Sequence, residues 1–192
     1  MAQVTYEVVA AISRRFGANE VPLEVEAHDF TLAELHDGLR DSRAVLQSIA
    51  DTWDDTQLHA RPPLKAGAGE EERWSAAGVL SHLCVTQNWY MLNMDRLLGQ
   101  RHHYASMPQG LGDQAQHEMP KAQLAPLLRA STGELLTYIA AIPATADLEA
   151  TRDSRFFGDL GLRGWVLLAI VHDYDHLGQL RSIARMAGFG EE

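Results

Sequence analysis

The chain has 192 residues, 46% of them hydrophobic, which is enough for one domain with a buried core. Its net charge of −10 argues against a nucleic-acid partner, because binding to the phosphate backbone requires a basic surface. A single cysteine, Cys84, excludes an intrachain disulfide and a cysteine-rich zinc cluster. With neither a secretory signal nor an apolar run of about 18 residues, the sequence predicts a cytoplasmic protein with no membrane partner.

The first 29 residues form an N-terminal extension that carries only weak structural signals. Residues 4–16 are compatible with a short helix. In residues 21–26 apolar and acidic side chains alternate, which is typical of a short edge strand or an extended arm. We therefore expect one helical domain over residues 30–188, preceded by this extension.

The first long helix is predicted to begin at Thr31, because Thr31 and Glu34 match the capping-box pattern. Its apolar residues form a single helical stripe that ends near Trp53 and that Arg43 interrupts. Residues 61–72 contain two prolines, two glycines and a charge run, which predict a loop.

The second long helix is predicted to start after an N-cap at Ser75 and to run to Leu98, where Gly99 supplies the stop signal. Residues 100–120 are rich in Gly, Gln, His and Met and include two prolines, which indicates a long connection. This connection implies a crossover between the second helix and the third.

A third helix is predicted over residues 121–142, with Pro126 in its first turn or at an early kink. Residues 151–159 are expected to form a loop. A fourth helix is predicted over residues 162–187, ending at Gly188. Helices of this length joined by such connections predict an all-α protein, and a helix bundle would bring the second and fourth helices side by side.

Three histidines point to a metal site. His172 and His176 are four residues apart, so both imidazoles project from one face of the fourth helix and can reach one ion. His82, on the second helix, is the best candidate for a third ligand. The pair interrupts an otherwise apolar inward face, where an unsatisfied nitrogen costs about 1–3 kcal/mol.

Hydrogen bonding is the alternative explanation for these histidines, because buried imidazoles often bond to backbone carbonyls or to carboxylates. Asp173 and Asp175 are close enough in sequence to suggest surface ion pairs. The spacing of His172 and His176 also occurs in zincin proteases, but Asp173 stands where the HExxH motif has its glutamate. The doublet His172-Asp173 also occurs in HD phosphohydrolases, but those enzymes need a further His and Asp from other helices. The chain contains no nucleotide-binding loop and no GxSxG motif.

Two segments resemble motifs of the DinB/YfiT-like superfamily. The first is RWSAAGVLSHL at residues 73–83, with a Trp-Ser helix start and His82; the second is HDYDHLGQL at residues 172–180. The resemblance covers roughly residues 31–188 and implies a four-helix bundle in up-down-down-up order with a long crossover. It places His82, His172 and His176 on the three metal-ligand positions of the family.

This resemblance implies a metal-dependent enzyme with a small-molecule substrate, and a homodimer is common among relatives. Our first hypothesis is a thiol S-transferase, in which a divalent metal activates a low-molecular-weight thiol cosubstrate. Zinc suits three imidazoles, and nickel, iron or manganese would also fit.

Side chains on the same helical faces complete the predicted site. Thr86 and Trp89 share the face of His82, and Gln179 shares that of His176, so these three are expected to line a pocket. A metal-dependent hydrolase using a metal-bound hydroxide is the alternative enzyme, with Asp175 or Asp173 as the base or as a partner of a ligand. The third hypothesis is a non-catalytic metal-binding stress-response protein.

Overall fold

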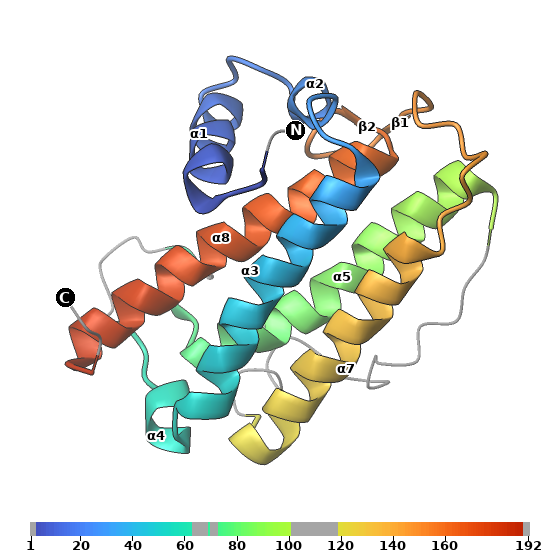
Figure 1. The fold of residues 1–192 in the computed structure, drawn as a ribbon. Helices are drawn as coiled ribbons and strands as arrows, with labels where there is room; N and C mark the ends of the chain where they lie inside the picture. The colour runs from blue at the N-terminus through green and yellow to red at the C-terminus, as the bar shows by residue number, and fades with distance from the viewer. Residues whose placement is uncertain (1–2, 63–68, 70–72, 101–118, 190–192) are drawn as a thin grey trace.

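Four long helices, α3 (Leu32–Thr52), α5 (Ala76–Leu98), α7 (Lys121–Ala140) and α8 (Leu162–Ala187), form the body of the molecule (Figure 1). The computed structural model describes residues 3–62, 69, 73–100 and 119–189. Its shorter elements are helices α1 (Tyr6–Gly17), α2 (Leu23–Ala27) and α4 (Asp55–Leu58), and the antiparallel strands β1 (Arg152–Asp153) and β2 (Asp159–Leu160). The all-α class predicted from the sequence is confirmed, with one small hairpin over residues 152–160, where the sequence predicts a loop at 151–159.

The long helices pack so that α3 and α5 each contact both α7 and α8. In Figure 1, α3 and α8 run in one direction and α5 and α7 in the other. Leu46, Leu80, Leu128 and Leu180, one from each long helix, belong to the same buried cluster. Burial of each leucine contributes about 1.5–3 kcal/mol, so this cluster holds α5 and α8 together at the level of the candidate site.

Local capping signals set most of the helix ends, as the sequence predicts. Thr31 forms a complete capping box with Glu34, and the Ser75 side chain accepts a hydrogen bond from the backbone of Gly78. Gly99 and Gly188 end α5 and α8 in the left-handed conformation, with φ of 65° and 79°. α7 ends two residues earlier than predicted, at Ala140, and contains Pro126 inside the helix. Most of the predicted connections 61–72 and 100–120 lie outside the described residues.

The N-terminal extension differs from the sequence-based expectation, because residues 21–26 do not form a strand or an extended arm. Residues 23–27 form helix α2, which begins after Pro22. Leu23 and Ala27, one helical turn apart, are fully buried, whereas Val25 is 58% exposed. A strand would place Val25 on the same buried face as Leu23, but Val25 faces solvent, so the alternating pattern predicted the wrong element.

The acidic residues of α2 are buried, contrary to the alternating pattern. Glu26 forms two hydrogen bonds with the Arg15 guanidinium, at 2.6 and 2.7 Å. The Glu24 carboxylate accepts a hydrogen bond from the backbone N–H of Gly161 at 2.7 Å, immediately before α8. The first interaction joins α1 to α2, and the second attaches the extension to the bundle, where α1 and α2 both contact α8.

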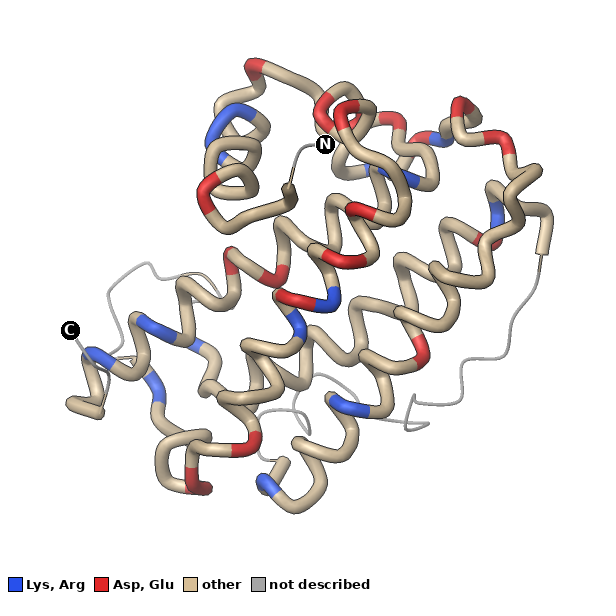
Figure 2. The backbone as a smooth tube through the Cα atoms, in the orientation of Figure 1, with Lys and Arg blue, Asp and Glu red and all other residues tan. Residues whose placement is uncertain are grey.

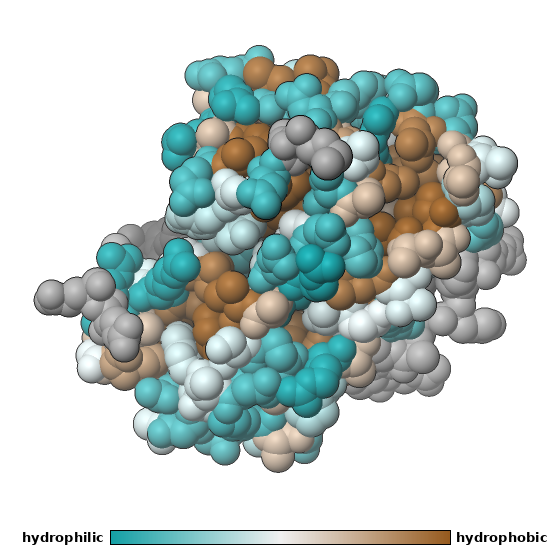
Figure 3. All heavy atoms as spheres, in the orientation of Figure 1, coloured by the Kyte–Doolittle hydropathy of each residue, from teal (hydrophilic) through white to brown (hydrophobic). Residues whose placement is uncertain are grey.

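Acidic residues are spread over the extension, α3 and the hairpin, and none of the described helices carries a continuous row of basic residues in this view (Figure 2). On the face shown in Figure 3, apolar residues reach the surface in separate areas with polar residues between them. Among the described residues, no helix combines the length and apolar character needed to cross a membrane. Of the large apolar side chains that the structure describes, Phe156 is the most exposed, at 70%.

Candidate metal centre

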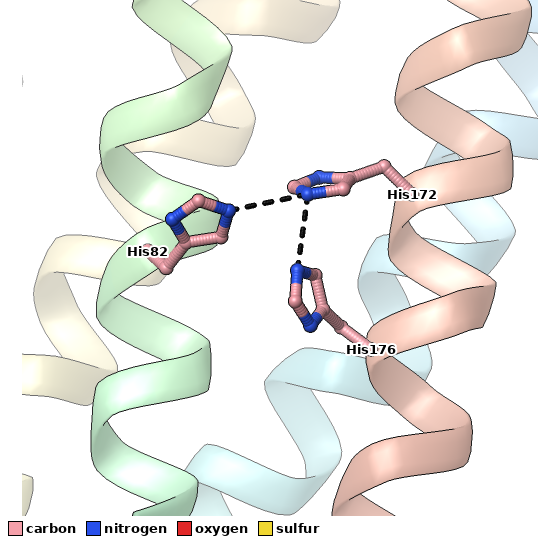
Figure 4. Close-up of side chains that lie close together, drawn as sticks. All are labelled: His82, His172 and His176. Atoms are coloured by element: carbon pink, nitrogen blue, oxygen red, sulfur yellow. Dashed lines mark hydrogen bonds between the residues drawn. The ribbon is translucent and has the colours of Figure 1, made fainter. Parts of the chain in front are cut away.

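The three predicted histidines come together between α5 and α8 (Figure 4). His172 lies in the centre: its Nε2 atom is 3.2 Å from Nε2 of His82 and 3.0 Å from Nε2 of His176. One nitrogen from each ring lies within 4.8 Å of the other two. The same ring atom, Nε2, faces the cluster from His172 and from both of its neighbours.

These distances suit a metal ion. Tetrahedral coordination with metal–nitrogen bonds of about 2.0–2.1 Å places two ligand nitrogens about 3.3 Å apart. The Nε2 atoms of His82 and His176 lie 3.2 and 3.0 Å from that of His172, close to this value. Converging imidazole nitrogens repel one another as lone pairs unless a cation or a proton lies between them. The donor set therefore fits a divalent ion held by three neutral imidazoles.

Gln179 fixes the orientation of the His176 ring. Its side-chain oxygen lies 2.8 Å from Nδ1 of His176, so Nδ1 carries the proton and donates it to the amide. The Nε2 atom of His176 then presents its lone pair to the cluster. A hydrogen bond of this kind is typical of the partners that orient metal-ligating histidines. Gln179 thus contacts His176 and does not line the cavity described below.

The electrostatic environment keeps His172 neutral. Burial lowers its pKa well below 6.5, and the neighbouring rings of His176 and His82 and the Arg43 guanidinium lower it further. Its Nδ1 atom is buried and has no hydrogen-bond partner among the described residues. A neutral imidazole is the form that binds metal, so this ring is prepared for ligation at neutral pH.

Asp173 lies behind the histidines, in a buried ion pair with α3. Its Oδ2 atom accepts hydrogen bonds from Nε of Arg43 and from Oγ of Ser42, both at 2.8 Å. The side chains of Arg43 and Asp173 are only 1% and 0% exposed. The expected surface ion pair is therefore wrong for Asp173, and the arginine that interrupts the stripe of α3 is the buried partner of this carboxylate.

Burial raises the pKa of the Asp173 carboxyl, while Arg43 and the hydrogen bond from Ser42 lower it. The ion pair joins α3 to α8, and its carboxylate residue, Asp173, directly follows His172 in the sequence. Because every described hydrogen bond of Asp173 goes to α3, its role as a base in the reaction does not fit this geometry. Asp175, the other carboxylate proposed from the sequence, is exposed and lines the cavity beside the histidines.

A cavity of ≈ 510 Å³ opens beside the cluster. His82 and His172 line it, together with Thr86 and Trp89, which the sequence places on the face of His82. The Thr86 hydroxyl lies 3.1 Å from Nε2 of His82 and donates a hydrogen bond to the backbone carbonyl of that residue. A small molecule in this cavity would thus meet the open side of the three-histidine cluster.

The sequence-based reasoning missed several walls of the site. The Trp74 ring lies 4.7 Å from that of His82 and 6.2 Å from that of His176, and packs against the cluster. The sequence does contain one signal for Trp74, its position directly before Ser75, the N-cap of α5. Tyr90, Phe157 and, from α1, Phe16 also line the cavity. Nothing in the local sequence pattern connects these three residues with the histidines.

Comparison with known proteins supports the assignment of the fold. The search of curated proteins finds no relative that matches the chain. The DinB superfamily matches residues 38–180, a segment that contains His82, His172 and His176. The match covers more than half of the chain and includes all of α5 and α7 and most of α3 and α8. The chain therefore belongs to the DinB superfamily.

Proposed function

We propose that the protein is a metal-dependent enzyme that activates a low-molecular-weight thiol and transfers it to a small-molecule electrophile. The observation that carries this proposal is the convergence of three Nε2 atoms beside a cavity that His82 and His172 line. Zinc is the ion that we propose for this donor set. A divalent ion with three neutral imidazoles keeps an open position and favours the thiolate form of a thiol.

The surrounding residues supply the other requirements of the reaction. Gln179 holds His176 in the tautomer that ligates, and burial keeps His172 neutral. The proton that leaves the thiol is released to solvent through the cavity, which Asp175 lines at an exposed position. The thiolate sulfur then attacks the electrophilic carbon; a new carbon–sulfur bond forms, and the leaving group departs with the electrons of the broken bond.

The cavity also favours a catalytic ion over a structural one. An ion that only stabilises a bundle is expected to be enclosed by its ligands, with no space for a substrate. The cavity of ≈ 510 Å³ beside His82 and His172 favours catalysis. Hydrolysis by an activated water is the second candidate reaction, which the carboxylate of Asp175 at the same wall supports.

A spectroscopic titration tests thiol binding directly. Protein loaded with Co²⁺ and titrated with 2-mercaptoethanol should develop a sulfur-to-metal charge-transfer band. The variant His172→Ala should show none, and His36→Ala, which removes a histidine outside the cluster, should behave like the unmodified protein. The transfer itself is followed with 1-chloro-2,4-dinitrobenzene as electrophile. Equal rates in the unmodified protein and in His172→Ala would contradict the proposal.

A further inference from the structure

The hairpin between β1 and β2 holds two phenylalanines in a fixed turn. The Ser154 hydroxyl accepts hydrogen bonds from the backbone N–H groups of Phe156 and Phe157, at 3.4 and 2.7 Å. The backbone N–H of Ser154 in turn donates to the carbonyl of Gly158 at 2.9 Å. Both rings line the cavity, although Phe156 is 70% exposed. Phe156 thus presents an apolar ring at the edge of the cavity.

Trp89 connects these rings with the bundle. Its ring centroid lies 6.4 Å from that of Phe156 and 6.1 Å from that of Phe157. Behind it, the buried Trp165 packs edge-on at 4.8 Å and holds the indole in place. Aromatic side chains from α5 and from the hairpin therefore form one wall, at distances typical of aromatic pairs.

Helix α1 adds a further ring to the same wall. Phe16 lines the cavity and lies 6.1 Å from Phe157 between ring centroids. Ser13 and Gly17 of α1 line it as well. Because α1 lies outside the residues 38–180 that match the superfamily, this part of the cavity is not defined by the matched segment. The N-terminal extension thus contributes to the wall of the cavity.

The charge of the cavity restricts the ligand further. Asp175 is the one carboxylate among the described lining residues, and these include no lysine or arginine. Arg155 stacks on the Phe156 ring at 5.4 Å, but it is not a lining residue. An anionic group near Asp175 would be repelled by the carboxylate, whereas a cation there would be attracted by it and by the faces of the aromatic rings. A divalent ion at the histidines would act in the opposite sense, so the positive charge of the ligand must lie away from the reacting end.

We propose, on the basis of the function proposed above, that the small-molecule substrate of this site carries a flat aromatic group and a positive charge. The aromatic group packs against Trp89 and Phe157, and the cationic group faces Asp175. The remaining end of the cavity, at His82 and His172, receives the reacting group. Phe16 of α1 and Phe156 of the hairpin close the aromatic wall.

A matched set of three probes tests ring and charge separately: benzylamine, benzyl alcohol and benzoate. Their binding to the full-length protein, treated with chelator so that benzoate cannot bind a metal, is followed by NMR chemical-shift titration. We expect benzylamine to bind about tenfold more tightly than benzoate, with benzyl alcohol between them. Asp175→Asn should bring benzylamine to within about twofold of benzyl alcohol, whereas the exposed control Asp41→Asn should change nothing.

Two further variants test the aromatic wall. Trp89→Ala should weaken all three probes, and Trp53→Ala, a tryptophan outside the cavity, should not. If Trp89→Ala fails to fold by circular dichroism, Phe156→Ser decides, because this side chain is mostly exposed and its loss leaves the core intact. The proposal is overturned if benzoate binds as tightly as benzylamine, if no probe binds, or if neither Asp175→Asn nor the folded wall variants alter binding.

The metal content of the same preparations, measured before chelator treatment, keeps the two proposals separate. Stoichiometric metal without probe binding would overturn the substrate class and leave the metal-dependent function standing. Charge-selective probe binding in a protein that takes up no metal would overturn the metal-dependent function and retain the ligand class.

Discussion

The buried ion pair between Arg43 and Asp173 allows a quantitative test of the fold around the site. In the variant Arg43→Met, the carboxylate of Asp173 remains buried and loses its charged partner. Removing one member of a buried pair costs about 3–5 kcal/mol. The Ser42 hydroxyl still donates one hydrogen bond to Asp173, so we expect a loss at the lower end, about 3 kcal/mol. For a chain of this length, that is a decrease of about 6–12 °C in Tm.

A double-mutant cycle separates the ion pair from the general cost of each substitution. Asp173→Asn leaves the Arg43 guanidinium without a charge partner and should cost a similar amount. The combined variant Arg43→Met, Asp173→Asn carries no buried charge at this position, so its loss should be smaller than the sum by about 2 kcal/mol. Urea unfolding of chelator-treated protein, followed by circular dichroism, measures all four free energies. Additive losses would refute the ion pair as the link between α3 and α8.

Three further predictions concern the metal and the extension. At a free zinc concentration of about 1,000 times Kd, the free energy of unfolding should rise by about 4 kcal/mol. In a thermal scan, zinc should therefore raise the Tm of the unmodified protein but not that of His172→Ala. Gln179→Ala should weaken zinc affinity about 10–100-fold in competition with a chromophoric chelator, while the fold is retained. Gly164→Ala places a Cβ against the Glu24 carboxylate, so the free energy of unfolding, measured with urea, should fall by about 1–3 kcal/mol. At Gly178 an added Cβ meets no atom within 4 Å, so Gly178→Ala should not lower stability.

Local signals explain why the helices were predictable. The side chains of Thr31 and Ser75 cap the first turns of α3 and α5, and Gly99 and Gly188 end α5 and α8. Each of these signals acts within a few residues, so the sequence contains it directly. The spacing of His172 and His176 is equally local, because both lie on one face of α8.

The remaining features depend on contacts between distant parts of the chain. Arg43 interrupts an apolar stripe, and its partner Asp173 lies on another helix, so the sequence pattern alone did not show that both are buried. Residues 23–27 form a helix because tertiary contacts bury Glu24 and Glu26, which an alternating pattern assigns to solvent. The aromatic wall comes from α1, α5 and the hairpin, and only packing brings these elements together.

The metal content of the protein tests the central claim most directly. Protein purified without an affinity tag is measured by elemental analysis, together with the double variant His172→Ala, His176→Ala. The matched control is His36→Ala, His59→Ala, which removes two histidines outside the cluster. We predict close to one divalent ion per chain in the unmodified protein and in the control, and almost none in the cluster variant. Metal-free protein that takes up no ion on reconstitution, or metal retained without His172 and His176, would contradict the account.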